Sequence, residues 1–206
     1  MKLIVISRSK VHLGEEKVVS ELFEQGLQVF HLRKPTASAE EIEHFLKRLP
    51  QKYLNRVVLH TQHELAPKYG LKGIHLTSKH RKKKLKAWFL VQYLKIKHPT
   101  LTISTSFHSV DTLTSGGAFY HYAFLSPVFD SISKKKHLGR FAEVDLRNLD
   151  QDIIALGGIN EENIGALKKK GYSGAAVLGA IWSSKDPIET FIKIKKQCEQ
   201  QPMASA

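Results

Sequence analysis

Eight short apolar segments, separated by helix-forming stretches, are the feature that most restricts the fold of this chain. Several of them are apolar at nearly every position, as in parallel strands that are covered on both faces. Eight repeats of a strand followed by a helix predict a single closed (β/α)8 barrel, a TIM barrel. An open, doubly wound sheet is the alternative, but no G-x-G-x-x-G motif follows the first strand. The predicted strands are 2–7, 27–32, 56–60, 73–76, 101–106, 121–126, 152–157 and 174–179.

The length and composition suit a single domain. A chain of 206 residues with 42% hydrophobic residues can bury a sizeable core, so we expect one barrel domain over residues 1–198 and a flexible tail over 199–206. The only cysteine, Cys198, excludes an intramolecular disulfide framework and a cysteine-based metal cluster. The apolar run at the N-terminus is too short for a signal sequence or a membrane span. We therefore expect a cytoplasmic protein without membrane association.

Positive charge is the outstanding feature of the composition. The formal net charge is +13, and basic runs at 79–86, 134–137 and 193–197 carry part of it. Nucleic acid, an anionic surface or a phosphorylated small molecule would each explain such an excess. No nucleic-acid-binding motif accompanies the runs, and lysine runs are most often solvated helix faces. We expect a small phosphorylated ligand and keep a nucleic-acid-binding barrel as an alternative.

Local signals mark several helix boundaries. The helix after the first strand is expected to stop at Gly26, since glycine readily adopts the left-handed conformation that ends helices. Ser38 and Glu41 form a capping box that predicts the start of the next helix. A helix is also expected over 160–171, and Pro187 predicts the first turn of the last helix.

A basic helix is predicted after the fourth strand. Its apolar positions recur three to four residues apart, which is typical of an amphipathic helix. These positions are Leu85, Trp88, Phe89 and Leu94.

Polar residues follow the second strand, where a barrel of this kind carries its active groups. His31 and Arg33 fall on the same face of that strand because side chains alternate with a period of two. An unpaired buried charge is costly, so Arg33 needs an anionic partner, and its guanidinium suits a phosphate, diphosphate or carboxylate. A structural ion pair with a neighbouring acid is the alternative. Lys34 is adjacent but points the other way.

The loop after the sixth strand offers a second set of polar groups. Ser131, Ser133 and Lys134 place two hydroxyls and an ammonium within a short segment that could hold phosphate or carboxylate oxygens. Loops of this composition are common, so this signal alone is weak.

Glycines follow the last two strands. Gly157 and Gly158 come after the seventh strand and Gly179 after the eighth, where barrels of this kind often bind phosphate. Glycine lets the backbone approach a ligand closely, and the helix start beyond it presents free N–H groups. The alternative is that these glycines only permit tight turns.

The fifth strand ends with Ser106 and His108. A histidine can take up or release a proton near neutral pH, which suits a general acid or base. The same segment also reads as a helix start with Ser109 as the N-cap. The residues alone leave both interpretations open.

Taken together, six motifs resemble the thiamine phosphate synthase/TenI family, in the right order from Leu3 to about Ile194. They are VFHLRKP, GIHL, STSFHS, SPVFDSISK, IALGGINEENI and GAAVLGAIWSS. The resemblance implies a (β/α)8 barrel that handles the phosphorylated thiazole half of thiamine. Synthases of the family join the thiazole phosphate to a pyrimidine methyl diphosphate and release pyrophosphate with Mg²⁺. The TenI branch includes thiazole tautomerases, which aromatise a thiazole carboxylate phosphate by proton transfer without a metal.

The resemblance also implies roles for the candidate residues. The thiazole-phosphate site of the family maps onto Gly157, Gly158, Leu178, Gly179 and Ala180. The other substrate contacts map onto His31, Arg33, Lys34, His60, Ser106, Ser131, Ser133 and Lys134. The catalytic histidine of the tautomerase branch matches His108.

The chain departs from the synthase pattern at both positions that hold metal carboxylates. Thr61 and His80 stand where synthases carry the two aspartates that bind Mg²⁺. Mg²⁺ prefers oxygen ligands such as carboxylates, and neither residue replaces one. His31 stands where synthases usually have glutamine, and Pro35 where they have lysine.

These departures favour a metal-independent thiazole tautomerase that uses His108 for proton transfer and needs no cofactor. The alternative is a thiamine phosphate synthase, which would need Mg²⁺ unless the run 79–86 supplies the counter-charge. A further alternative is a non-catalytic barrel that binds a phosphorylated ligand or nucleic acid. The expected partner is a thiazole phosphate, and association into homo-oligomers is left open.

Overall fold

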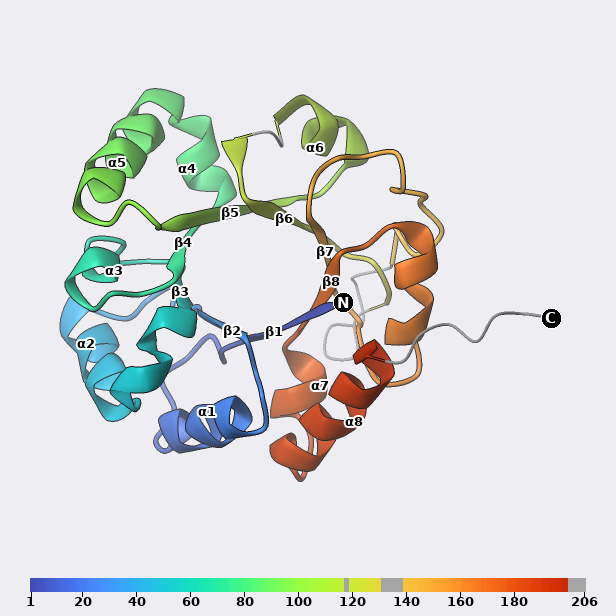
Figure 1. Ribbon diagram of the computed structural model, residues 1–206, viewed down its shortest axis with the longest axis horizontal. Coiled ribbons are helices and arrows are strands. Elements are labelled where there is room, and N and C mark those ends of the chain that lie inside the picture. Colours follow the sequence, from blue (N-terminus) through green and yellow to red (C-terminus); the bar gives the residue numbers. More distant parts are fainter. Residues whose placement is uncertain (117–118, 131–138, 200–206) are drawn as a thin grey trace.

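The protein forms a closed barrel of eight parallel strands, each hydrogen-bonded to its neighbours in sequence, with β1 pairing β8 to close the ring (Figure 1). The structure is a computed structural model and describes residues 1–116, 119–130 and 139–199. The strands are β1 Lys2–Ile6, β2 Val29–Leu32, β3 Val57–Leu59, β4 Gly73–Leu76, β5 Thr102–Phe107, β6 Tyr122–Leu125, β7 Ile153–Leu156 and β8 Gly174–Val177. The predicted (β/α)8 barrel is confirmed, and all eight strands lie within the segments expected for them or one residue beyond.

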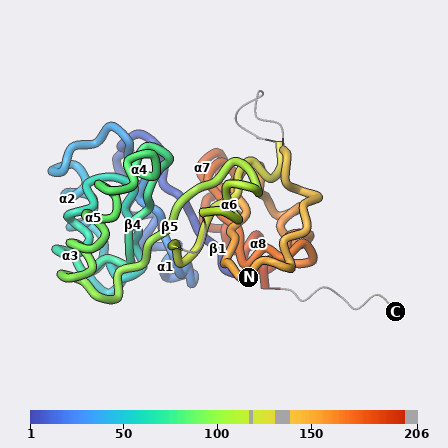
Figure 2. Tube along the Cα trace, turned by 90° about the horizontal axis from the view of Figure 1, so that it is seen from above, coloured from blue at the N-terminus to red at the C-terminus, as the bar shows by residue number. Residues whose placement is uncertain are grey.

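Helices surround the barrel on its outside (Figures 1 and 2). The α-helices are α1 Glu15–Glu24, α2 Ala39–Arg48, α3 Leu65–Lys68, α4 Ser78–Lys82, α5 Lys84–Lys97, α6 Val110–Gly116, α7 Gly179–Trp182 and α8 Pro187–Glu199. The 3₁₀ helices within the described ranges are η1 Gln51–Arg56, η3 Ile164–Ala166 and η4 Lys168–Lys170. Because α8 includes Glu199, the expected tail loses its first residue, and the rest of it, 200–206, lies outside the described residues. Within the described part of the chain, no helix is long and apolar enough to cross a membrane.

The predicted helix boundaries are largely confirmed. Gly26 follows α1 with φ +92°, and the side chain of Ser38 accepts a hydrogen bond from the Glu41 N–H at the start of α2 while Glu41 completes the capping box. Helix α8 begins at Pro187 as expected.

The prediction of a helix over 160–171 is wrong, because this segment forms a turn and two short 3₁₀ helices. Asn160 accepts hydrogen bonds from the N–H groups of Glu162 and Asn163, and the Asn163 amide donates to the Gly158 carbonyl. Asparagine side chains that bond nearby backbone groups compete with the α-helical pattern. The bond from Asn163 to Gly158 also holds the segment against the turn after β7.

Two apolar layers hold the fold together. The larger layer lies between the strands and the helices, and a smaller one fills the barrel itself. The barrel interior contains Ile4, Ile6, Val29, Val58, Tyr122, Phe124, Ile154 and Ala176. His31 is paired in register with Ile6 and Val58, so its side chain belongs to this interior layer.

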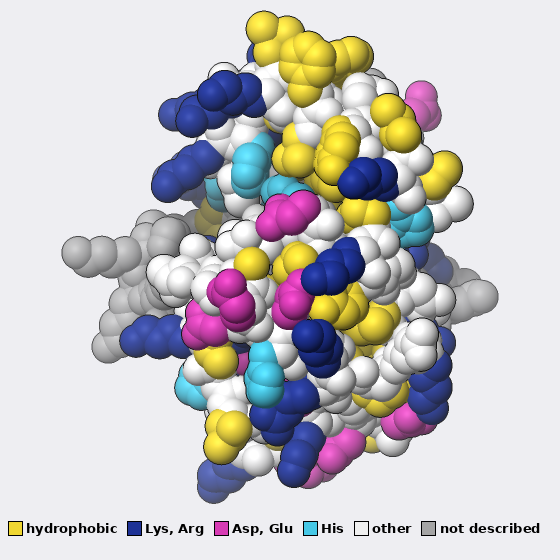
Figure 3. Space-filling model, turned by 90° about the vertical axis from the view of Figure 1, so that its left-hand side faces the viewer, with side chains coloured by type: hydrophobic (Ala, Val, Ile, Leu, Met, Phe, Trp, Pro, Cys, Tyr) yellow, Lys and Arg dark blue, Asp and Glu magenta, His cyan; other side chains and the backbone are white. Residues whose placement is uncertain are grey.

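Helix α5 carries apolar side chains on two faces. Val91 and Leu94 are buried against the barrel, whereas Leu85, Trp88 and Phe89 are 75%, 48% and 63% exposed. Three of the four apolar positions expected for this helix therefore face solvent. A helix that is apolar nearly all round gives no pattern from which the buried side can be chosen. Figure 3 shows the side of the molecule that carries α2, α3 and α5, where hydrophobic side chains lie among Lys and Arg.

Candidate active site at the carboxyl ends of the strands

The predicted site residues gather at one rim of the barrel. All eight strands are parallel, so their carboxyl ends form a single rim, here called the mouth. Arg33 follows β2, His108 follows β5, and the glycine turns follow β7 and β8. Active sites of barrels of this class lie at this end.

The turn after β7 requires its two glycines. Gly157 and Gly158 have φ values of +102° and +67°, which side chains rarely adopt. A Cβ on Gly158 would lie 2.2 Å from the Asp130 carbonyl oxygen, so the loop after β6 packs directly on this turn. The close packing against Asp130 is by itself a sufficient reason for glycine at position 158.

The turn after β8 lies beside it, because β7 and β8 are neighbours in the barrel. Helix α7 begins at Gly179, directly after Leu178. Among the described residues, the N–H groups of Gly179 and Ala180 have no backbone acceptor, as expected for the first turn of a helix. Such groups can donate hydrogen bonds to a phosphate. Tight packing at the turn after β7 and phosphate binding at the turn after β8 are therefore compatible.

His108 lies exposed at the mouth and has a defined hydrogen bond. Its Nδ1 is 2.8 Å from the carbonyl oxygen of Ser126, an acceptor to which it donates. In the neutral ring this leaves the lone pair on Nε2, which is the form needed by a general base. Helix α6 is capped by Ser109, whose hydroxyl oxygen accepts a hydrogen bond from the Thr112 N–H. The capping role therefore belongs to Ser109, and the imidazole of His108 is left for other contacts.

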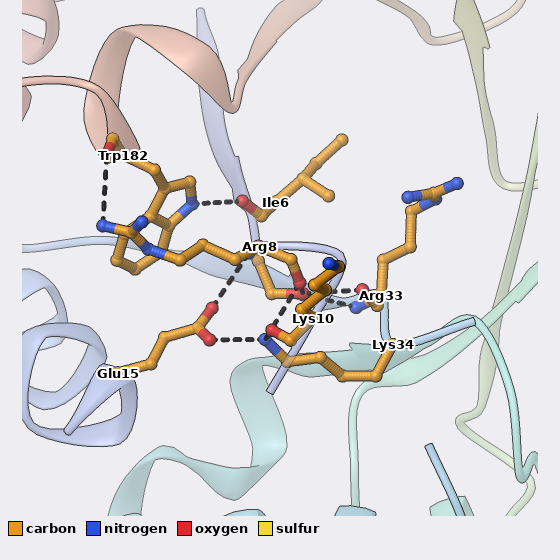
Figure 4. A network of polar contacts seen from close by, with 8 residues as sticks. Ile6, Arg8, Lys10, Glu15, Arg33, Lys34 and Trp182 are labelled. Carbon is orange, nitrogen blue, oxygen red and sulfur yellow. Dashed lines mark hydrogen bonds and ion pairs between the residues drawn. The ribbon is translucent and has the colours of Figure 1, made fainter. Parts of the chain in front are cut away.

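The ammonium of Lys34, expected from the sequence to contact substrate, is buried and bonded to groups of the protein itself. Its ammonium donates to the carbonyl oxygens of Arg8 and Lys10 and to the carboxylate of Glu15 (Figure 4). An ammonium has three hydrogens, so these three acceptors saturate it. The side chains of Lys34 and Glu15 are 2% and 1% exposed. The pair is a buried structural contact that fixes the loop after β1.

Arg33 behaves differently from its neighbour. Figure 4 shows its side chain extending away from Glu15, to the side opposite Arg8. It is exposed, and its guanidinium has no hydrogen-bond or ion-pair partner within the described ranges. The alternative of a structural ion pair therefore has no support in this part of the chain. A guanidinium free at the mouth is suited to an anionic ligand.

Two further arginines lie at the mouth, and the sequence did not single out either of them as a candidate site residue. Arg8 follows β1, donates to the carbonyl oxygen of Trp182 and lies 5.1 Å from the centroid of the Trp182 ring. Arg81, in α4, donates to the carbonyl oxygen of Ser106 over 2.7 Å and lies over the Phe107 ring. Both follow barrel strands, and that position was the signal that could have identified them.

The predicted contacts His31, His60 and Ser106 belong to a network inside the barrel. His31 bonds His60 through Nδ1 at 2.9 Å and the Tyr122 hydroxyl through Nε2 at 2.7 Å. His75 lies between the hydroxyls of Ser104 and Ser106, at 3.0 Å from each. The alternation of side chains along β4 to β6 could have identified the three members that were not selected, His75, Ser104 and Tyr122.

These histidines are neutral at physiological pH. Burial lowers the pKa of His31 to about 3. Burial also lowers the pKa values of His60 and His75 well below the usual range, with smaller effects from the neighbouring histidines and from Arg33. They supply no positive charge to the mouth.

Ser131, Ser133 and Lys134 lie outside the described residues. Their expected contact with phosphate or carboxylate oxygens therefore stays a prediction.

The residues at the expected magnesium positions do not fit that ion. Thr61 donates its hydroxyl to the Lys34 carbonyl oxygen, and Nδ1 of His80 accepts the Thr77 N–H at the start of α4. In the described part of the chain, the one group of three or more side chains arranged to hold a metal consists of histidines. Mg²⁺ prefers carboxylate and other oxygen ligands, so this donor set does not suit it.

The fold and the mouth define a (β/α)8 barrel whose candidate active-site residues lie at the carboxyl ends of its strands. A model of the thiamine monophosphate synthase family (TMP-TENI) matches residues 3–181, and the chain belongs to this family. The resemblance seen in the sequence is thereby confirmed.

Individual relatives agree with this assignment. The thiamine-phosphate synthase of Bacteroides fragilis strain YCH46 is 30% identical over 184 residues, which cover 83% of this chain and 87% of the relative. That of Prochlorococcus marinus strain AS9601 is 26% identical and covers 97% of this chain but 56% of the relative. The chain thus spans little more than half the length of this Prochlorococcus protein.

Solved structures show the same fold. The crystal structure of a thiamine phosphate pyrophosphorylase from Bacteroides thetaiotaomicron has a TM-score of 0.75 and 31% identity, and the match covers 98% of this chain and 100% of that one. A thiamine phosphate pyrophosphorylase from Pyrococcus furiosus has a TM-score of 0.72 at 22% identity.

Proposed function

We propose that this protein acts in thiamine biosynthesis as a thiamine phosphate synthase, joining a thiazole phosphate to a pyrimidine methyl diphosphate. The names of its relatives support this reaction more directly than the tautomerase favoured by the sequence. In the reaction, the thiazole nitrogen attacks the methylene carbon of the pyrimidine. The carbon–oxygen bond to the diphosphate breaks, and its electron pair leaves with pyrophosphate.

The structural observation that carries the proposal is the guanidinium of Arg33 at the mouth, which has no partner among the described residues. Negative charge grows on the diphosphate as the carbon–oxygen bond breaks, and a fixed guanidinium stabilises that charge. The N–H groups of Gly179 and Ala180 would bind the phosphate of the thiazole on the far side of the mouth. This division gives each of the two substrates its own anion contact.

Positive side chains are proposed to supply the charge that Mg²⁺ provides in the resembling synthases. Arg81 reaches the end of β5, and the other cations of the run 79–86 are exposed without an ion pair in the described part of the chain. Exposed lysines raise the potential at the mouth and attract dianionic substrates.

A second candidate reaction is favoured by one observation, the hydrogen bond from His108 to Ser126. It leaves Nε2 of the neutral ring available as a base at the mouth. In a thiazole tautomerase, such a base would remove a proton from a ring carbon and deliver one to the exocyclic carbon.

Two assays separate the reactions. The first measures pyrophosphate release from thiazole phosphate and pyrimidine methyl diphosphate, with Mg²⁺ and with a chelator. The second measures aromatisation of the carboxythiazole phosphate tautomer. Pyrophosphate release that needs Arg33 supports the synthase, whereas aromatisation alone supports the tautomerase and overturns the first proposal. Turnover in neither assay would leave a non-catalytic ligand-binding barrel.

Arg147→Ala is a matched control for Arg33→Ala. Arg147 is an exposed arginine paired with Asp145, and its backbone packs on Gly171, just before β8 begins. It therefore lies at the rim opposite the mouth. The synthase proposal expects a large loss in Arg33→Ala and an unchanged rate in Arg147→Ala.

A further inference from the structure

Three histidines meet inside the barrel, and neither proposed reaction uses them. His31, His60 and His75 come from or directly follow the neighbouring strands β2, β3 and β4. One ring nitrogen of each lies within 4.8 Å of the others, and the three side chains are buried. The rings of His60 and His75 stack with centroids 4.1 Å apart.

Ordinary packing does not require this arrangement. The cluster lies against the apolar interior of the barrel, where the ring of Phe124 is 5.0 Å from that of His31 and 5.2 Å from that of His75. Among the described residues, no carboxylate bonds the three rings, so they are not held as charged partners of an acid. Burying three imidazoles among apolar side chains costs free energy, which the hydrogen bonds to Tyr122, Ser104 and Ser106 and the bond between His31 and His60 offset in part.

We propose that His31, His60 and His75 form a binding site for a divalent transition-metal ion, with Zn²⁺ as the ion of best fit. Neutral imidazole is a good ligand for zinc, cobalt, nickel and copper, and a poor one for magnesium. Three histidines are also the ligand number of zinc sites that keep one position open. Its ligands differ from Thr61 and His80, which stand at the magnesium positions of the resembling synthases.

The hydrogen bonds around the cluster already orient two of the rings for a metal. The Tyr122 hydroxyl holds Nε2 of His31, which leaves Nδ1 facing His60. The Ser104 hydroxyl holds Nδ1 of His75, which leaves Nε2 on the side of Ser106, nearer the mouth. Metal-binding histidines characteristically bond a second group through the nitrogen that does not bind the metal.

The closest pair of rings needs only a small shift to admit the ion. Nδ1 of His31 and Nε2 of His60 are 2.9 Å apart. Two nitrogens bound to one tetrahedral zinc at about 2.0–2.1 Å would lie roughly 3.3–3.4 Å apart, so this pair must separate by about half an ångström. Each ring would carry its hydrogen on the far nitrogen, which requires a change of tautomer but no net loss of protons.

The ion would lie beneath the mouth. Ser106 is half-buried and its hydroxyl is 3.0 Å from Nε2 of His75, so it marks the side of the cluster that faces the strand ends. The fourth position would then be open to Ser106, to water or to an anionic ligand. The charge of the ion would add to that of Arg33, which lies close enough to lower the pKa values of His60 and His75.

Metal binding by the full chain tests the proposal without any enzyme assay. The protein is stripped with a chelator, dialysed against Zn²⁺ and analysed for bound metal, and a parallel sample is titrated with Co²⁺. We expect one equivalent of zinc and the strong visible absorption of low-coordinate Co²⁺ bound to nitrogen. Substoichiometric zinc, or Co²⁺ with the weak spectrum of the hydrated ion, would overturn the proposal.

Variants assign the site. His60→Gln and His75→Gln are expected to abolish stoichiometric binding, while Tyr122→Phe keeps all three rings and should weaken binding about 10–100-fold. His44→Gln is the matched control, since His44 is exposed on α2. Circular dichroism identifies any variant that fails to fold. Zinc binding that survives in folded His60→Gln and His75→Gln would place the metal elsewhere and overturn the assignment.

Discussion

Nδ1 of His108 donates a hydrogen bond to the carbonyl oxygen of Ser126, 2.8 Å away, and this contact links the ends of β5 and β6 at the mouth. It defines which nitrogen of the neutral ring can accept a proton. The tautomerase candidate depends on this nitrogen, whereas the synthase proposal depends on Arg33.

Replacing His108 with alanine should separate the two reactions. If His108 is the base, aromatisation of the carboxythiazole phosphate should fall about 10²–10⁴-fold, the usual contribution of a positioned acid or base. Steady-state kinetics on His108→Ala and on the surface variant His44→Ala measure this effect. An unchanged aromatisation rate in His108→Ala would remove His108 from the tautomerase mechanism.

Breaking the buried pair of Lys34 and Glu15 should destabilise the protein. Burial lowers the pKa of Lys34, and the carboxylate of Glu15 opposes that effect. Glu15→Gln leaves an uncompensated buried charge, and we expect the free energy of unfolding to fall by about 3–5 kcal/mol. Urea denaturation measures the loss. The exposed pair of Lys52 and Glu24 is the control, and Glu24→Gln should leave the stability nearly unchanged.

Stability of the metal-free protein should fall as the pH decreases below 7. Burial lowers the pKa of His31 to about 3 and that of His63 to about 4, so both stay neutral when folded and take up protons only after unfolding. The unfolded chain thus binds more protons between about pH 6.5 and pH 4, and stability is lost as pH falls through this range. Each such histidine contributes a slope of up to about 1.4 kcal/mol per pH unit. Urea titrations at pH 7, 6 and 5 in chelator measure it, and equal stability at pH 7 and pH 5 would contradict the buried neutral assignment.

The two apolar faces of α5 should respond differently to truncation. Leu94→Ala removes a buried side chain and should cost about 2–5 kcal/mol. Phe89→Ala changes an exposed position and should stay within about 0.5 kcal/mol. Thermal and urea unfolding compare the variants, and a large loss in Phe89→Ala would show that this face is covered in solution.

A side chain at Gly158 should disturb the turn after β7. Gly158→Ala combines a φ of +67° with a Cβ placed 2.2 Å from the Asp130 carbonyl oxygen. The left-handed conformation alone costs roughly 1–2 kcal/mol, and displacement of the adjacent loop adds to it. Gly165→Ala is the control, because a Cβ there meets nothing within 4 Å. Calorimetry with thiazole phosphate should show weaker binding in Gly158→Ala and unchanged binding in Gly165→Ala.

Local patterns in the sequence determined the barrel and several of its details. The eight apolar segments predict eight parallel strands because a strand buried on both faces must be apolar throughout. The boundaries at Gly26, Ser38 and Pro187 follow from the conformational preferences of single residues. The placement of Arg33 and His108 at the mouth follows from their position directly after strands.

Contacts between distant segments decided the rest. Lys34 follows Arg33 directly, yet the ammonium of Lys34 is paired with Glu15 of α1, whereas the guanidinium of Arg33 has no partner in the ranges that the structure describes. The outward apolar face of α5 depends on which side packs against the barrel. His31, His60 and His75 are separated by 29 and 15 residues along the chain and meet only because three parallel strands place them at similar height inside a closed barrel.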